Sequence, residues 1–135
     1  MTCACGWQAE VRDHAPGTGL VWLLYGVGWD GSPFLEADLD DITLEVRERR
    51  AGVSLAPASL VIADVVHDTP VTGDVRWDGG AQGYNLEVVV PGDAFPAGMS
   101  AYRASLLLTP SDPAGEPFAA RLNVYTSTLQ QWGTP

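Results

Sequence analysis

The chain has 135 residues and a formal net charge of −10, with 17 acidic residues against seven basic ones. Apolar residues make up 46% of the chain, which is typical of a globular domain and not of a disordered segment. With so few cations the chain cannot neutralise many phosphates, so the composition excludes nucleic acid and anionic membrane surfaces as partners.

The N-terminal segment, residues 1–17, precedes the first strand-like run, and we expect it to be an arm. Its start has no Lys or Arg and no apolar run of signal-peptide length, so we expect no export signal. Cys3 and Cys5 would point to the same side of an extended segment, at a separation that disfavours a disulfide between them. We interpret them as reduced thiols. The alternative is a zinc or redox site, for which only His14 and His67 could help as ligands.

Strand-like runs follow one another along the rest of the chain. Residues 20–28 are apolar on both faces, which indicates a central strand or one covered by a partner. Residues 41–50 alternate between apolar and polar, as in a strand with one buried face. Residues 101–109 and 118–128 alternate in the same way on either side of a turn and predict a hairpin. The remaining strand-like runs are 59–67, 74–78 and 84–90.

These seven runs are separated by clusters of Gly, Pro, Asp and Ser, and no stretch has helical periodicity. The pattern predicts an all-β fold, an antiparallel immunoglobulin-like β-sandwich of about seven strands, with a small β-barrel as the alternative. The single sandwich domain would span residues 18–128, with a C-terminal tail over residues 129–135.

No catalytic motif occurs in the chain. Neither histidine has a partner at ligand spacing, and the Gly-x-Ser-x-Gly turn of a serine hydrolase is lacking. Five acidic residues between Asp30 and Asp41 could supply calcium ligands, but their spacing is not that of a calcium loop, and we interpret them as a solvated acidic turn. We therefore expect no catalytic residues, no metal, no cofactor and no enzymatic activity.

Two groups of residues are candidates for a contact surface. Arg47, Arg49 and Arg50 concentrate three of the seven cations at one strand end. They are either exposed charges in cross-strand ion pairs or a patch for an acidic neighbouring subunit. Trp22 and Trp77 lie in strand-like runs and are expected in the core or half-buried. The other tryptophans lie in the arms or in a Gly-rich loop, where we expect exposed contact residues: Trp7, Trp29 and Trp132.

The features between residues 20 and 126 follow a recognisable order. An acidic lead-in, Phe34-Leu-Glu-Ala-Asp-Leu39, precedes the strand Ile42-Thr-Leu-Glu-Val-Arg47, and a Gly-containing hairpin follows. Then come Phe95-Pro-Ala-Gly98, the strand Tyr102-Arg-Ala-Ser-Leu-Leu-Leu-Thr109, a turn, and a last strand ending in Val124-Tyr-Thr126. This order resembles the small immunoglobulin-like domains of tailed-bacteriophage structural proteins, such as the N-terminal domain of upper baseplate proteins.

The resemblance implies an assembly role in a virion, in the tail, baseplate or neck or as decoration on the capsid surface, with no catalytic residues. The partners would be other virion structural proteins and copies of the chain itself, assembled in the bacterial cytoplasm. The alternative is a carbohydrate-binding module that stacks a surface glycan on Trp29 and Trp77.

Overall fold

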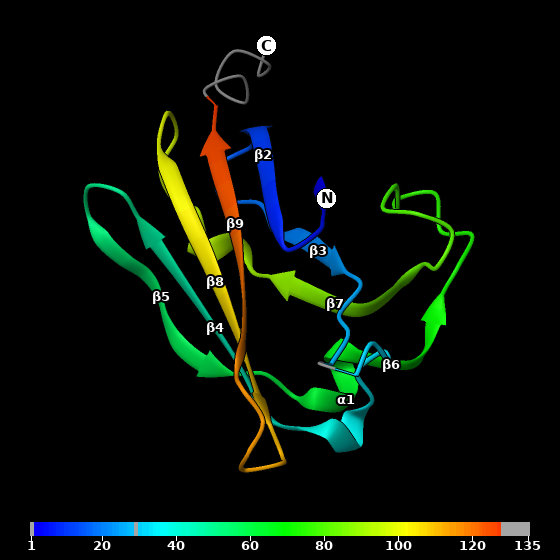
Figure 1. Ribbon diagram of the computed structural model, residues 1–135. Helices are drawn as coiled ribbons and strands as arrows, with labels where there is room; N and C mark the ends of the chain where they lie inside the picture. The colour runs from blue at the N-terminus through cyan, green and yellow to red at the C-terminus, as the bar shows by residue number, and fades with distance from the viewer. Residues whose placement is uncertain (1, 29, 128–135) are drawn as a thin grey trace.

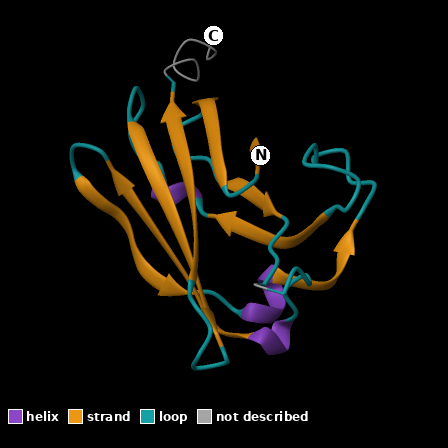
Figure 2. Ribbon diagram, in the orientation of Figure 1, coloured by secondary structure: helices purple, strands orange, loops and turns teal. Residues whose placement is uncertain are grey.

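The computed structural model of the chain describes residues 2–28 and 30–127. These residues form nine strands in two sheets that pack against each other, with only short helical turns between them (Figures 1 and 2). The all-β sandwich expected from the sequence is confirmed, with two more strands than expected. The two sheets remain separate, so the alternative of a closed barrel is wrong.

The strand order is that of immunoglobulin-like sandwiches, with β1 and β2 as a divided first strand. The four-stranded sheet has the order β1 (Thr2–Cys5), β3 (Leu20–Leu24), β7 (Tyr84–Val90) and β6 (Val66–Val71). The five-stranded sheet has the order β2 (Gln8–His14), β9 (Phe118–Thr126), β8 (Ala101–Pro110), β4 (Leu39–Glu48) and β5 (Gly52–Ser59). The helical segments in the connections are η1 (Glu36–Asp38), α1 (Ile62–Val65) and η2 (Gly92–Ala94).

The N-terminal segment is part of the sandwich, which corrects the arm expected over residues 1–17. β1 pairs in parallel with β3, and β2 pairs in parallel with β9, so the segment forms an edge of each sheet. The sheets are therefore mixed and not purely antiparallel. The chain crosses between them at Gly6, which has a φ of 106° and whose carbonyl accepts a 2.8 Å hydrogen bond from Trp22 Nε1. β1 is only four residues long, and the parallel partner of β2 lies far away in the sequence, so the alternation of polar and apolar residues over 8–12 was not recognised as a strand.

Two of the expected strands are also corrected. The run 59–67 is divided, because β5 ends at Ser59 and α1 intervenes before β6 begins. The run 74–78 is a series of turns inside the long connection from β6 to β7. By contrast the predicted hairpin is confirmed as β8 and β9, which pair antiparallel from Ala101↔Tyr125 to Leu108↔Phe118. Local alternation was sufficient there because both strands have one buried and one exposed face.

The main core lies between the sheets, and a second buried cluster lies on the outside of the four-stranded sheet. Alternate residues of β4, β8 and β9 point into the main core, whereas all five residues of β3 are buried. Val21, Leu23 and Tyr84 form the outer cluster, against which Cys5, Val71 and Trp77 pack. The burial of β3 on both faces, which the sequence predicts, is thus explained by other segments of the chain that cover its outer face.

The connection from β7 to β8 is fastened by a tyrosine corner, a feature of immunoglobulin-like sandwiches. Tyr102 lies near the start of β8, and its phenolic oxygen accepts a 2.8 Å hydrogen bond from the backbone N–H of Ala97. The same hydroxyl donates to Glu48 at 3.2 Å. The Tyr102 ring meets Phe95 edge to face, with centroids 5.4 Å apart. This contact joins the loop to the core and holds the register of β8 against β4.

Candidate interaction surface

Arginines from four strands gather on the outer face of the five-stranded sheet. Arg47 on β4 lies directly opposite Arg103 on β8. Arg103 lies opposite Asn123 on β9, and Arg121 lies two residues before Asn123 on the same side. Arg12 reaches the same face from β2. We call this surface the arginine face; it consists of Arg12, Arg47, Arg49, Arg103 and Arg121, all exposed.

The arginine face contains a shallow depression of about 560 Å³ near the end of β4. Arg47, Arg49 and Arg103 line it, together with Tyr125. The guanidinium of Arg12 lies over the Tyr125 ring, 4.7 Å from its centroid. Arg and Tyr are enriched at protein interfaces because each combines a broad contact area with directed hydrogen bonds. The depression is therefore suited to a protein contact more than to an enclosed small molecule.

The charge of the arginine face is only partly compensated. Arg47 pairs with Glu45 at 2.9 Å, and Arg12 pairs with Glu10 at 2.9 Å, all on the exposed surface. Arg103 donates a 3.3 Å hydrogen bond to the neutral amide of Asn123. Within residues 2–28 and 30–127, the structure shows no ion pair for Arg49 or Arg121. A chain of net charge −10 thus carries a local excess of positive charge on one face.

The structure brings the predicted arginines together and adds to them. Arg49 and Arg50 are exposed where β4 ends and the turn to β5 begins, next to Arg47. The sequence interpretation omitted Arg103 and Arg121. The sequence of the hairpin could have revealed them. Arg103 and Arg121 lie between buried positions, so they point to the outer face of their strands. Because β4 pairs with β8, they share that face with Arg47.

The predicted tryptophans do not form a common surface. Trp7 is half-buried in the crossing between β1 and β2, and its indole N–H donates to the carbonyl of Tyr25 at 3.0 Å. Its edge lines a groove with Phe118 and Arg121. Trp29 and Trp132 lie outside the described residues. Trp22 is fully buried, as expected.

Trp77 is half-buried as predicted, but in a loop and not in a strand. It packs on Tyr84 with ring centroids 5.7 Å apart, and its N–H donates to Gly80 at 2.8 Å. Cys5, expected on an arm, lies on β1, and its thiol donates to the carbonyl of Arg76 at 3.3 Å. Both side chains attach the loop over 72–83 to the outside of the four-stranded sheet.

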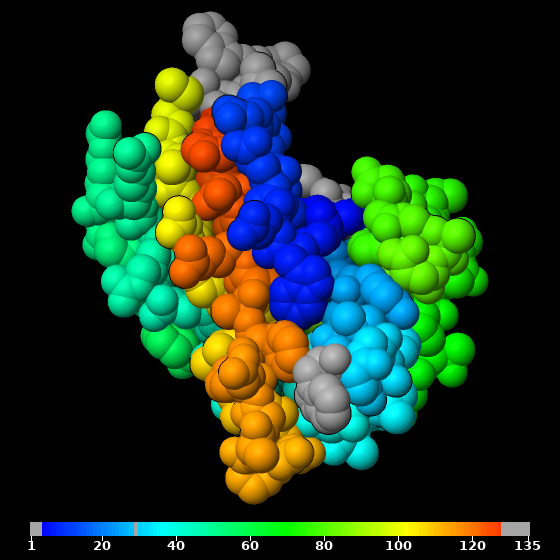
Figure 3. Space-filling model, viewed as in Figure 1, coloured from blue at the N-terminus to red at the C-terminus, as the bar shows by residue number. Residues whose placement is uncertain are grey.

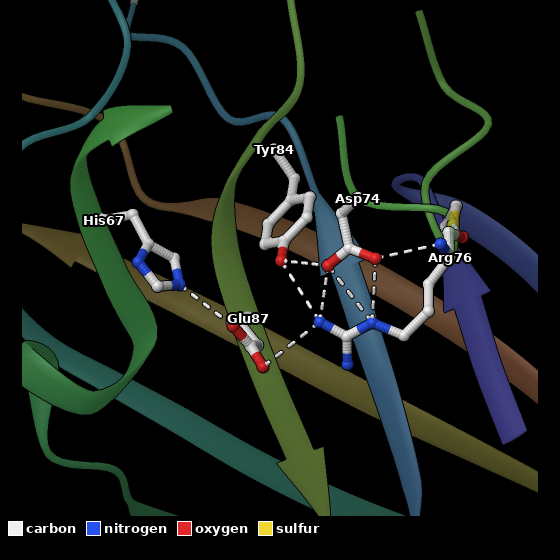
Figure 4. A network of polar contacts seen from close by, with 6 residues as sticks. His67, Asp74, Arg76, Tyr84 and Glu87 are labelled. Atoms are coloured by element: carbon white, nitrogen blue, oxygen red, sulfur yellow. Dashed lines mark hydrogen bonds and ion pairs between the residues drawn. The ribbon is translucent and has the colours of Figure 1, made fainter. Parts of the chain in front are cut away.

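A polar network fastens the same loop (Figure 4). Arg76 donates to both carboxylate oxygens of Asp74, the shortest contact being 2.7 Å, and the Tyr84 hydroxyl donates to Asp74 at 2.7 Å. Glu87 lies 3.8 Å from Nη2 of Arg76, the nitrogen that also donates to Asp74, and 2.9 Å from Nε2 of His67. His67 is thus a partly exposed member of this network.

Hydrogen bonds set the protonation of the network. Those from Arg76 and Tyr84 hold the pKa of Asp74 well below its ordinary value of 3.8. Burial, together with the bond to Asp74, raises the pKa of Tyr84 to about 12. Because Asp74 stays ionised and Tyr84 stays neutral, neither is poised to transfer a proton near neutral pH. The arrangement is that of a structural clamp.

In the acidic segment between Asp30 and Asp41, carboxylates accept hydrogen bonds from nearby backbone N–H groups. Asp30 accepts from the N–H of Ser32 and Asp38 from the N–H of Leu35. Among the described residues, no group of three or more Asp, Glu, His or Cys side chains is arranged to hold a metal ion. In the same residues, no helix is long and apolar enough to cross a membrane.

Comparisons of the chain with protein-family models, with curated proteins and with solved structures found no match.

Proposed function

We propose that the chain is a non-enzymatic structural subunit that acts through protein–protein contacts in a repetitive assembly, as in the virion of a tailed bacteriophage. The observation that carries this proposal is the arginine face, an exposed and incompletely paired cationic surface on a rigid sheet of an acidic chain. Exposed charges in such excess repel one another in the isolated chain and gain most when an acidic partner covers them.

The immunoglobulin-like strand order and the tyrosine corner are features of the kind of sandwich that the resemblance implies. Both agree with the order of sequence features on which the resemblance to phage domains depends. In this role the sandwich is a rigid spacer, and the exposed faces of its sheets provide the contacts. Its place would be in the tail, baseplate or neck or on the capsid surface.

The test is to purify particles from a culture that produces the chain and to quantify the chain in them by mass spectrometry. We expect a fixed ratio of the chain to the major capsid or tail-tube protein that survives a density gradient. A chain that stays in the unassembled fraction of the lysate would overturn the proposal.

Carbohydrate binding is the second candidate, and we propose Trp7 as its contact residue in place of Trp77. Trp77 is occupied by its contacts with Tyr84 and Gly80, whereas the edge of Trp7 lines a groove that also contains Phe118 and Arg121. An aromatic edge beside an arginine can contact a sugar ring and its hydroxyls. Screening on a glycan array tests this candidate. It would be favoured by glycan binding that is lost in a folded Trp7→Ala variant.

A further inference from the structure

The arginines are concentrated on one surface, and six of the 17 acidic residues gather on another. Five of the seven arginines form the arginine face, and Arg50 lies beside it. The seventh, Arg76, belongs to the clamp that it forms with Asp74 and Tyr84. At the opposite end, three segments carry exposed acidic residues and no arginine: η1, α1 with the start of β6, and the β8–β9 turn. We call this surface the acidic end; its members are Glu36, Asp38, Asp64, Asp68, Asp112 and Glu116.

Hydrogen bonds join the three segments of the acidic end into one surface. The N–H of Ser111, in the β8–β9 turn, donates to the carbonyl of Asp38 at 2.9 Å, and its hydroxyl donates to Ala37 at 3.0 Å. The N–H of Glu36 donates to the carboxylate of Asp68 at 2.8 Å. Figure 1 shows η1, α1 and the β8–β9 turn together at the lower end of the molecule and the β4–β5 turn at the upper end.

We propose that the arginine face binds the acidic end of a second copy of the chain, so that copies associate head to tail. This inference rests on the proposed function, because it names the partner that the arginine face takes in the assembly. Arg47, Arg49 and Arg103 receive carboxylates such as those of Glu36 and Glu116 from the neighbouring copy.

The choice of a second copy follows from charge complementarity. Copies of net charge −10 repel each other in most orientations, and the orientation that joins the acidic end to the arginine face places opposite charges in contact. Arginine forms paired hydrogen bonds with carboxylates, which fixes orientation as well as supplying attraction.

The geometry also determines the kind of assembly. The two surfaces lie on different parts of the molecule, so the contact is heterologous: each copy uses one surface for each of two neighbours. Such a contact repeats from copy to copy and closes into a ring or extends as a filament. β2, β9 and the projecting β8–β9 turn are all at the surface in the space-filling view (Figure 3).

The arginine face is accessible in the isolated chain, and its ion pairs, of Arg47 with Glu45 and of Arg12 with Glu10, are exposed. The side chains of Arg47 and Arg103 are exposed, and Tyr125 beside them is half-exposed. On the other surface, Glu36 and Glu116 are exposed, and among the described residues no arginine pairs with either. Replacing these four charged side chains should therefore leave the fold intact.

The test uses two full-length charge-reversed variants, Arg47→Glu/Arg103→Glu and Glu36→Arg/Glu116→Arg, studied by sedimentation equilibrium up to millimolar concentration. The wild type should self-associate, and each variant alone should associate at least about tenfold more weakly. Mixing the two variants should restore association, because each then meets its complement. Circular dichroism and thermal unfolding verify that both remain folded.

Matched controls change the net charge by the same amount on the remote edge of the other sheet. Four exposed positions in the loop from β6 to β7 can be changed together to Glu, as a control for the first variant, or to Arg, as a control for the second: Thr72, Val75, Ala81 and Gln82. Both controls should associate within about threefold of the wild type, since long-range effects of net charge are screened at physiological salt.

The outcomes separate this inference from the proposed function. Loss of association in each variant with recovery on mixing supports head-to-tail binding, even if the chain proves absent from particles. A wild type that stays monomeric, or association that the reversals leave unchanged, overturns it. If particles still contain the wild type in that case, the proposed function stands, and the arginine face binds a different acidic protein.

Discussion

Arg47 on β4 and Arg103 on β8 lie directly opposite each other, with both side chains on the exposed face of the five-stranded sheet. Like charges in opposed positions of neighbouring strands destabilise a sheet. Glu45 relieves this repulsion only from one side, through its 2.9 Å contact with Arg47. The pair therefore contributes little to the fold of the isolated chain and much to its capacity to receive carboxylates.

Because Arg47 and Arg103 repel each other, we expect a change at Arg47 to weaken self-association while leaving the free energy of unfolding nearly unchanged. Arg47→Thr removes both the repulsion with Arg103 and the exposed pair with Glu45, so the free energy of unfolding should change by less than about 0.5 kcal/mol. Denaturant unfolding measures that change, and sedimentation measures the accompanying weakening of self-association. A variant that loses several times that stability would show that Arg47 acts mainly within the fold.

The tyrosine corner predicts a cost for removing one hydroxyl. In Tyr102→Phe the N–H of Ala97 and the carboxylate of Glu48 lose their partner, and the free energy of unfolding should fall by about 1–2 kcal/mol. Tyr125→Phe is the matched control on the sheet surface and should change it by less than about 0.5 kcal/mol. Equal effects in the two variants would contradict the assigned role.

The clamp of Asp74, Arg76 and Tyr84 predicts that the stability of the fold depends on pH in the acidic range. The pKa of Asp74 is lower in the folded chain than its ordinary value of 3.8, so its contribution is present above about pH 4 and is lost as the pH falls further. Asp74→Asn should therefore be less stable than the wild type at pH 7, and the difference should shrink below about pH 4. Asp78→Asn, in the same loop, is the control. A difference between Asp74→Asn and wild type that does not vary with pH would contradict the ionic clamp.

The same clamp predicts a late phenol titration. The pKa of Tyr84 is raised from 10.0 to about 12 in the folded chain. The stabilisation linked to this neutral phenol is present below pH 10 and is lost as the pH rises towards 12. Absorbance of phenolate should show a component near pH 12 that Tyr84→Phe removes. If the spectra of wild type and variant differ only near pH 10, Tyr84 is not buried and hydrogen-bonded as described.

The N-terminal strands predict that the segment is required for folding. Deleting residues 2–14 removes β1 and β2 and with them the buried side chains of Ala4, Val11 and His14. Since domains are stable by only about 5–15 kcal/mol, loss of two strands should abolish cooperative unfolding. Thermal melting followed by far-ultraviolet circular dichroism measures the cooperativity of unfolding. A deletion that melts cooperatively at the wild-type temperature would mean that the segment is an arm after all.

The sequence predicted those parts of the fold that local alternation specifies. The β8–β9 hairpin was found because buried residues recur at alternate positions in each strand and a Pro- and Gly-rich turn separates the two strands. β1 and β2 were missed because their parallel partners lie elsewhere in the chain, and the divided run 59–67 shows that Val and Ile content alone does not separate a strand from a short helical turn.

The candidate surface was predicted only in part, for a related reason. Arg47, Arg49 and Arg50 are adjacent in the sequence, so their cluster was visible, whereas Arg103 and Arg121 join it through strand pairing. The clamp of Asp74, Arg76 and Tyr84 was not predicted at all, because it depends on how a Gly-rich loop folds back over the sheet. Pairing between distant segments is the information that composition and periodicity lack.

The most direct test of the central claim is the copy number of the chain in purified particles. Wild type and Arg47→Glu/Arg103→Glu are supplied in turn to a producer that lacks the chain, and the chain is quantified against the major structural protein. A structural subunit that binds through the arginine face predicts constant high occupancy for the wild type and a loss of at least about tenfold for the folded variant. Equal occupancy of the two, or no incorporation of the wild type, would contradict the claim.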